Sequence, residues 1–75
     1  MQKSATSRRF DPERLKAARR LLGRGAYTRM AVVSGVSEQT VRNWAQGKSE
    51  PDATQLHAIA DLTGKPLDFF FRNAA

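Results

Sequence analysis

The sequence contains no cysteine and only one histidine, His57, among its 75 residues. Without cysteine the chain can form neither a disulfide framework nor a thiolate metal site. A single histidine with no second ligand beside it argues against a metal site, so we expect no metal and no cofactor. The chain also lacks a nucleophile–base set, paired carboxylates and a glycine loop that cradles phosphate. These absences predict that the protein is not an enzyme.

Long apolar runs are also missing. No segment approaches the length that spans a bilayer, and the N-terminus lacks the apolar block of a secretion signal. We therefore expect no membrane partner and a cytoplasmic location, with nucleoid association if the protein is bacterial or phage-encoded. A chain of 75 residues makes one small domain, and we expect no small-molecule ligand.

Negative charge is scarce in the first part of the chain. Up to Arg29 there are nine lysines and arginines against two acidic residues, a net charge of +7. The rest of the chain has four lysines and arginines against five acidic residues, a net charge of −1. A basic excess of this kind suits a polyanion, because each neutralised phosphate releases condensed counterions. The alternative is a basic surface that only keeps the protein in solution.

The polar character of the two ends sets the expected domain boundaries. Residues 1–9 show no periodicity and indicate a flexible basic arm. Residues 10–72 are expected to form the folded domain, and residues 73–75 a frayed C-terminus. We expect one domain with a short tail at each end.

Helix start and stop residues predict five helices and no strand. The first begins at the N-cap Asp11 and ends at Gly23, in a left-handed conformation. Asp52 and Gln55 form the capping-box pattern of another helix. The expected helices, in order, cover residues 12–22, 27–34, 38–46, 53–63 and 66–71.

Residues 27–46 have the pattern of a helix-turn-helix. Ala31 falls where two helices approach closely, and Gly35 falls at the turn, where a positive φ is needed. Four apolar side chains point inward to hold both helices to a core: Met30, Val36, Val41 and Trp44. For Trp44 this core position is weighed against a role in base stacking, and its spacing from Val41 favours the core.

From about Leu15 to Phe71 the chain resembles the Cro and phage-repressor type of helix-turn-helix protein. The resemblance rests on "MAVVSGVSEQTVRNWAQGKSEPDATQLHAIADLTGKPLDFFF", with its Gly-Val-Ser turn, its "W-x-x-G-K-x-x-P" segment and its final "L-D-x-F-F" helix. It implies an all-α, compact five-helix lambda-repressor-like DNA-binding domain, with double-stranded DNA as the partner. One departure is Tyr27, which stands where the family has a glutamine that grips a phosphate.

The outward face of the helix after Ser37 carries the side chains that we expect to contact bases: Glu38, Gln39, Arg42 and Asn43. Gln39 and Asn43 can each pair bidentately with adenine, and Arg42 can pair with guanine or with a phosphate. Glu38 can accept from a cytosine amino group or can orient Arg42 four residues later, and the second role is favoured.

Five further residues are better placed to contact the DNA backbone: Tyr27, Ser37, Thr40, Gln46 and Lys48. Ser37 and Thr40 flank a helix start whose free N–H groups attract phosphate. Thr40 can equally touch a thymine methyl group. Lys48 lies in the loop where the family commonly meets the sugar-phosphate strand, and the Tyr27 hydroxyl can reach a phosphate in place of the usual glutamine.

The arm and the first helix carry basic residues with two open interpretations. Lys3, Arg8 and Arg9 can reach around the duplex or into a minor groove, or they can form a solubilising tail. The arginines of the first helix can approach phosphates or can pair with acids elsewhere in the chain.

The last helix predicts a homodimer. Phe69 lies where relatives usually have a polar residue, and an exposed phenylalanine on a short helix calls for a partner surface. Val32 and Val33 form a weaker alternative patch for the dimer, because the second helix lies closer to DNA. We therefore expect a dimeric, sequence-specific transcriptional regulator, a repressor in the simplest case, on a near-palindromic operator. The alternative is a protein-interaction module with the same fold, in an antitoxin-like or scaffold role, that does not recognise specific DNA.

Overall fold

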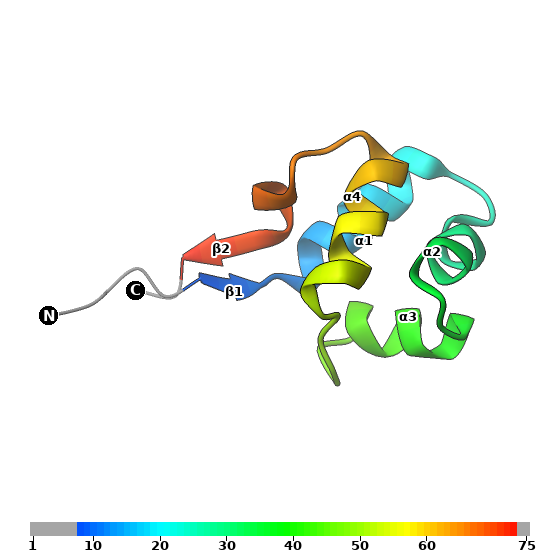
Figure 1. Cartoon of the computed structure of the whole chain (residues 1–75), viewed down its shortest axis with the longest axis horizontal. Helices are drawn as coiled ribbons and strands as arrows, with labels where there is room; N and C mark the ends of the chain where they lie inside the picture. The colour runs from blue at the N-terminus through cyan, green and yellow to red at the C-terminus, as the bar shows by residue number, and fades with distance from the viewer. Residues whose placement is uncertain (1–7, 74–75) are drawn as a thin grey trace, which may run out of the picture.

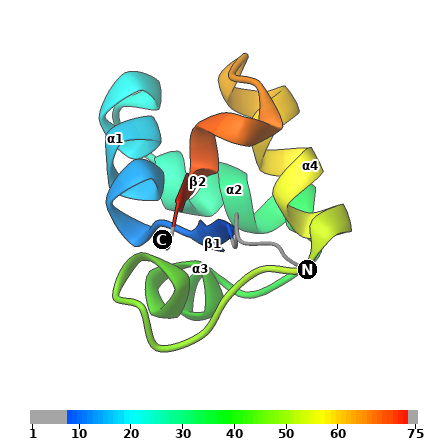
Figure 2. The ribbon, with the colours of Figure 1, turned by 90° about the vertical axis from the view of Figure 1, so that its left-hand side faces the viewer.

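The computed structural model describes residues 8–73 and shows, in this part of the chain, four α-helices, one short 3-10 helix and a two-stranded ribbon (Figure 1). The helices are α1 (Pro12–Leu22), α2 (Ala26–Ser34), α3 (Glu38–Ala45), α4 (Ala53–Thr63) and the 3-10 helix η1 (Leu67–Phe70). The strands are β1 (Arg8–Phe10) and β2 (Phe71–Asn73). Seen along the ribbon, α1 and α4 lie on its two sides and α3 lies beneath it (Figure 2).

Capping side chains set the helix boundaries as the sequence predicts. The Asp11 side chain accepts a hydrogen bond from the Glu13 backbone N–H at 3.0 Å and caps α1. Asp52 and Gln55 exchange both hydrogen bonds of the capping box at the start of α4. Gly23 ends α1 with φ at 80° but ψ at −145°, so it lies outside the left-handed helical region that was expected.

The ribbon corrects the expectation that the chain has no strand and shortens the two expected loose ends, whose residues 1–7 and 74–75 lie outside the described residues. Arg9 pairs with Arg72, and Phe10 pairs with Phe71, in an antiparallel register. Arg8 and Arg9 therefore lie in a strand and not in a flexible arm. Asn73 likewise belongs to β2, where a frayed terminus was expected.

Contacts between distant parts of the chain explain why the ribbon forms. Phe10 is buried in the core, which fixes the residues before it close to the body. The Asp11 N–H donates to the Phe70 carbonyl oxygen at 2.9 Å, and an Arg8 guanidinium nitrogen lies 3.0 Å from an Asp68 carboxylate oxygen. These pairings join residues about 60 positions apart, so local periodicity could not reveal them.

The expected fifth α-helix is a single 3-10 helix of four residues, η1. Phe71 already has extended backbone angles, φ −117° and ψ 157°, because it pairs with Phe10. The aromatic run therefore divides between a short helical turn and a strand, in keeping with the preference of aromatic residues for strands.

Phe69 does not project into solvent as the sequence analysis expects. It is half-buried and packs against the core, with its ring edge-on to Phe70 at 5.2 Å between centroids. Arg14 and Lys65 each place a cation about 5 Å from the Phe69 ring centroid. The expectation of an exposed phenylalanine is wrong, because this chain covers the ring with its own residues.

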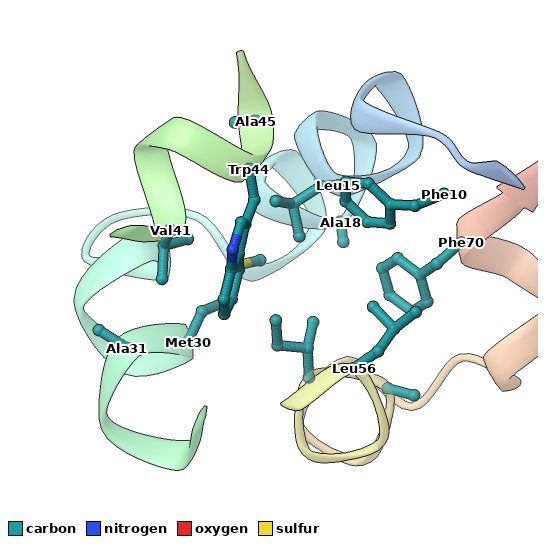
Figure 3. Packing of buried hydrophobic residues seen from close by; sticks show 12 residues of the cluster. Phe10, Leu15, Ala18, Met30, Ala31, Val41, Trp44, Ala45, Leu56 and Phe70 are labelled. Atoms are coloured by element: carbon teal, nitrogen blue, oxygen red, sulfur yellow. The ribbon is translucent and has the colours of Figure 1, made fainter. Parts of the chain in front are cut away.

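The core lies between the helices and receives side chains from each of them (Figure 3). Trp44 extends from α3 toward Met30 of α2, while Phe10 and Phe70 approach each other from the two ends of the chain (Figure 3). Met30, Val41 and Trp44 are buried as predicted. Val36 is partly buried against the same cluster.

Candidate nucleic-acid interface

The turn between α2 and α3 holds the second helix at the surface. Gly35 has φ 72° and ψ 31°, a left-handed conformation that side chains beyond glycine rarely adopt. The Val36 N–H then donates to the Ala31 carbonyl oxygen at 3.1 Å. Because Val41 and Trp44 anchor one face of α3 in the core, the opposite face is left for solvent or for a partner.

The outward face of α3 is polar. Glu38, Gln39, Arg42 and Gln46 are exposed and Asn43 is partly exposed. The Gln39 side-chain amide donates to the Asn43 side-chain oxygen at 3.1 Å. This pairing leaves one Gln39 amide hydrogen, the Gln39 oxygen and the Asn43 NH₂ group for an external partner.

Glu38 occupies the orienting role that the sequence favours for it. One of its carboxylate oxygens accepts from Arg42 at 3.2 Å. The same oxygen accepts from the Thr28 hydroxyl at 3.0 Å, which ties α3 to α2. Arg42 is thereby held on the outward face by a carboxylate that is itself fixed.

The two ends of α3 carry the residues expected at the DNA backbone. The Ser37 hydroxyl caps α3 by accepting from the Thr40 N–H at 3.1 Å, and the two hydroxyls lie 2.9 Å apart. At the other end, the exposed Lys48 follows Gly47, and its N–H donates to the Asn43 carbonyl oxygen at 2.9 Å. The turn is therefore ordered where the lysine emerges.

Tyr27 is a contact point for two arginines. Its ring is half-buried, and the guanidinium groups of Arg19 and Arg42 lie 5.1 Å and 5.3 Å from the ring centroid. Arg19 thus stacks on an aromatic ring, which was neither of the two roles considered for the arginines of the first helix.

Sequence reasoning missed one concave surface, which we call the arginine hollow. It is lined by Arg19, Arg20, Arg24, Tyr27, Glu38 and Arg42, together with the turn before α2, and it measures about 390 Å³. Its residues come from α1, the turn after it, α2 and α3. The density of arginine over residues 14–29 was a possible indication, but helical spacing alone does not show which of these side chains converge.

The other predicted contact residues are not gathered at α3. Arg8 and Arg9 lie in the ribbon, which leaves the helical body at the end away from α2 (Figure 1). Arg8 there stacks over Phe71 at 5.0 Å as well as pairing with Asp68. Lys3 lies outside the described residues.

No group of acidic and histidine side chains suited to a metal ion occurs among the residues that the structure describes. The single histidine, His57, is exposed on α4. In the same part of the chain, every helix is too short or too polar to cross a membrane.

Comparison with known proteins adds one finding to this geometry. A family model described as Helix-turn-helix matches residues 15–70, which includes the turn at Gly35 and the whole of α3. Comparisons with curated proteins and with solved structures gave no match.

Proposed function

The chain belongs to the helix-turn-helix family of the Cro and phage-repressor type, a DNA-binding family, and from this premise we propose that it is a sequence-specific transcriptional regulator. In this proposal α3 enters the major groove of double-stranded DNA and recognises base edges. Repression is the simplest outcome, because occupancy of a promoter by a small domain is enough to block it.

The observation that carries the proposal is the division of α3 into two faces. Val41 and Trp44 are buried, while the opposite face presents two amides and a guanidinium group. Gln39 and Asn43 would each pair with adenine, and Arg42 with guanine or a phosphate. Glu38 would set the direction of Arg42 and would reach a cytosine only after releasing it.

Contacts to phosphates would position α3 without adding sequence information. Ser37, Thr40, Gln46 and Lys48 stand at the two ends of the helix, and Tyr27 lies beside its first turn. The formal net charge of +6 favours association with a polyanion and makes the affinity dependent on salt.

Selection of bound duplexes from a random library, followed by fluorescence anisotropy at several salt concentrations, tests the proposal. Gln39→Ala and Asn43→Ala should each lose about 1–3 kcal/mol of binding free energy at the selected site and should lose little on random DNA. His57→Ala, an exposed polar change on α4, is the matched control and should bind as the wild type does. If Gln39→Ala and Asn43→Ala both bind the selected site with wild-type affinity, α3 is not the recognition helix.

We further propose that the protein binds its operator as a homodimer through the outer face of α2. Val32 is 75% exposed and Val33 is 42% exposed, which makes this face a better candidate than the covered Phe69. A two-fold dimer would place its recognition helices about 34–36 Å apart on a near-palindromic operator. In sedimentation velocity, Val32→Glu should be monomeric, and Phe69→Glu should be dimeric at a temperature at which circular dichroism shows it to be folded. A wild type that stays monomeric at high micromolar concentration, with and without operator, contradicts the dimer.

The same exposed valines favour a second candidate function, a protein-interaction module that does not select DNA sequences. It predicts that library selection yields no enriched duplex while Val32→Glu abolishes binding to a protein partner.

A further inference from the structure

The arginine hollow concentrates positive charge on one concave surface. Four of its side chains are arginines and only one, Glu38, is an acid, which gives the lining a net charge of +3. Glu38 is already engaged with Arg42 and with the Thr28 hydroxyl. Within the described residues, no carboxylate lies at ion-pair distance from Arg19, Arg20 or Arg24.

The hollow is also held in shape. Tyr27 supports Arg19 and Arg42 on its ring, and the Glu38–Thr28 hydrogen bond joins α3 to α2. At the turn, Gly25 is the N-cap of α2 and provides no side-chain acceptor, and the Ala26 N–H donates to the Gly23 carbonyl oxygen at 3.2 Å. Cations brought together without a counter-charge repel one another, and a bound anion would relieve that repulsion.

We infer that the arginine hollow binds an oligophosphate, a chain of two or more phosphoryl groups. The planar guanidinium fork matches two phosphate oxygens at once, which a single ammonium group cannot do. A lone phosphate group carries a charge of about −1.5 to −2 at neutral pH, which leaves part of the +3 unbalanced. The volume of about 390 Å³ lies at the small end of ligand sites, and its charged walls suit an anion better than an apolar compound.

Two sources can supply this chemistry. One is a run of successive phosphates on a DNA strand passing beside α3. The other is a free oligophosphate, such as a nucleoside triphosphate or inorganic tripolyphosphate. Because Arg42 and Tyr27 belong both to the hollow and to the proposed DNA interface, a free oligophosphate bound there would compete with DNA. The site thus goes beyond the proposed function and supplies a means of regulating it.

Inorganic tripolyphosphate is the probe, added to the full chain while backbone amides and arginine side-chain N–H groups are followed by NMR. We expect shifts centred on Gly25, Ala26 and Tyr27. Arg20→Gln/Arg24→Gln should weaken tripolyphosphate binding by about tenfold or more, since it removes two charge-assisted contacts.

Arg9→Gln/Arg72→Gln is the matched control. It removes the same two charges from exposed, paired positions of the ribbon, and it should change the affinity by less than about threefold, as expected for distant charges screened by salt. Glu38→Gln should tighten binding, because it removes the one negative charge of the hollow. Thermal melting would show whether Arg20→Gln/Arg24→Gln unfolds. In that case the higher tripolyphosphate affinity expected for Glu38→Gln still tests the inference.

Measuring duplex binding by the same variants separates the two sources of phosphate, a DNA strand and a free oligophosphate. If Arg20→Gln/Arg24→Gln also weakens duplex binding more than the control does, then DNA phosphates share the hollow. If duplex affinity falls only as it does in the control, the ligand is a free oligophosphate. Equal tripolyphosphate affinity in the two double variants, or amide shifts spread over the whole basic surface, overturns the inference. Sequence preference measured without tripolyphosphate tests the proposed function separately.

Discussion

Trp44 is the largest side chain of the core, and its replacement by alanine should remove a large part of the folding stability of the domain. The residue is only 2% exposed and extends from α3 toward α2 (Figure 3). Replacing a core Phe or Trp by Ala lowers the free energy of unfolding by about 3–5 kcal/mol, because the removed ring leaves a cavity and its contacts are lost. A chain of 75 residues has a total free energy of unfolding of roughly 4–11 kcal/mol.

Urea denaturation followed by far-UV circular dichroism measures this loss. Fluorescence does not serve, because Trp44 is the only tryptophan and the variant removes it. Trp44→Phe is the control, since it keeps an aromatic ring in the same space; we expect it to lose roughly 1–3 kcal/mol and to remain folded. Its DNA affinity, measured well below its melting temperature, should equal that of the wild type.

Loss of DNA binding without loss of stability would refute the assignment of Trp44 to the core. If Trp44→Ala unfolds at the wild-type urea concentration yet no longer binds DNA, then the ring contributes to binding and not to the core. A loss of DNA affinity in folded Trp44→Phe would point to the same conclusion. Base stacking, which was set aside because of the spacing from Val41, would then be the correct role.

Three further predictions concern single residues. Lys48→Ala should weaken binding to every duplex by a similar factor and reduce the salt slope by about one unit; lost specificity with an unchanged slope would instead assign Lys48 to base contact. Gly35→Ala should cost roughly 1–2 kcal/mol of folding stability, from backbone strain alone, because a side-chain carbon at this glycine meets no atom within 4 Å; a thermal melt at the wild-type temperature contradicts this. Asp52→Ala should cost about 1 kcal/mol by removing an N-cap, and an unchanged urea midpoint would show that the capping box adds no stability.

The sequence predicted best the features that depend on neighbours a few residues apart. The Asp11 and Ser37 caps lie within three residues of the N–H groups that they accept from. The buried positions of α3 follow from helical spacing, and the Gly35 turn follows from one glycine. Each of these features is local, so a pattern in the sequence is sufficient to find it.

Features that join distant segments were not predictable in this way. The ribbon pairs Arg9 with Arg72, and neither strand has enough residues to show alternation. The cover over Phe69 comes partly from Arg14 on α1, so the exposure of this ring could not be judged from its own helix. The arginine hollow likewise requires the relative placement of α1, α2 and α3.

The ribbon also means that the folding unit is wider than the helix-turn-helix match. The match covers residues 15–70 and so omits Phe10, Asp11 and both strands. A fragment cut at those limits would lose a buried aromatic side chain of the core and the N-cap of α1 together. Its first helix would begin at Leu15 without a cap, and Phe70 would lose the Asp11 N–H bonded to its carbonyl. We therefore expect the smallest fragment that folds by itself to run from β1 through β2.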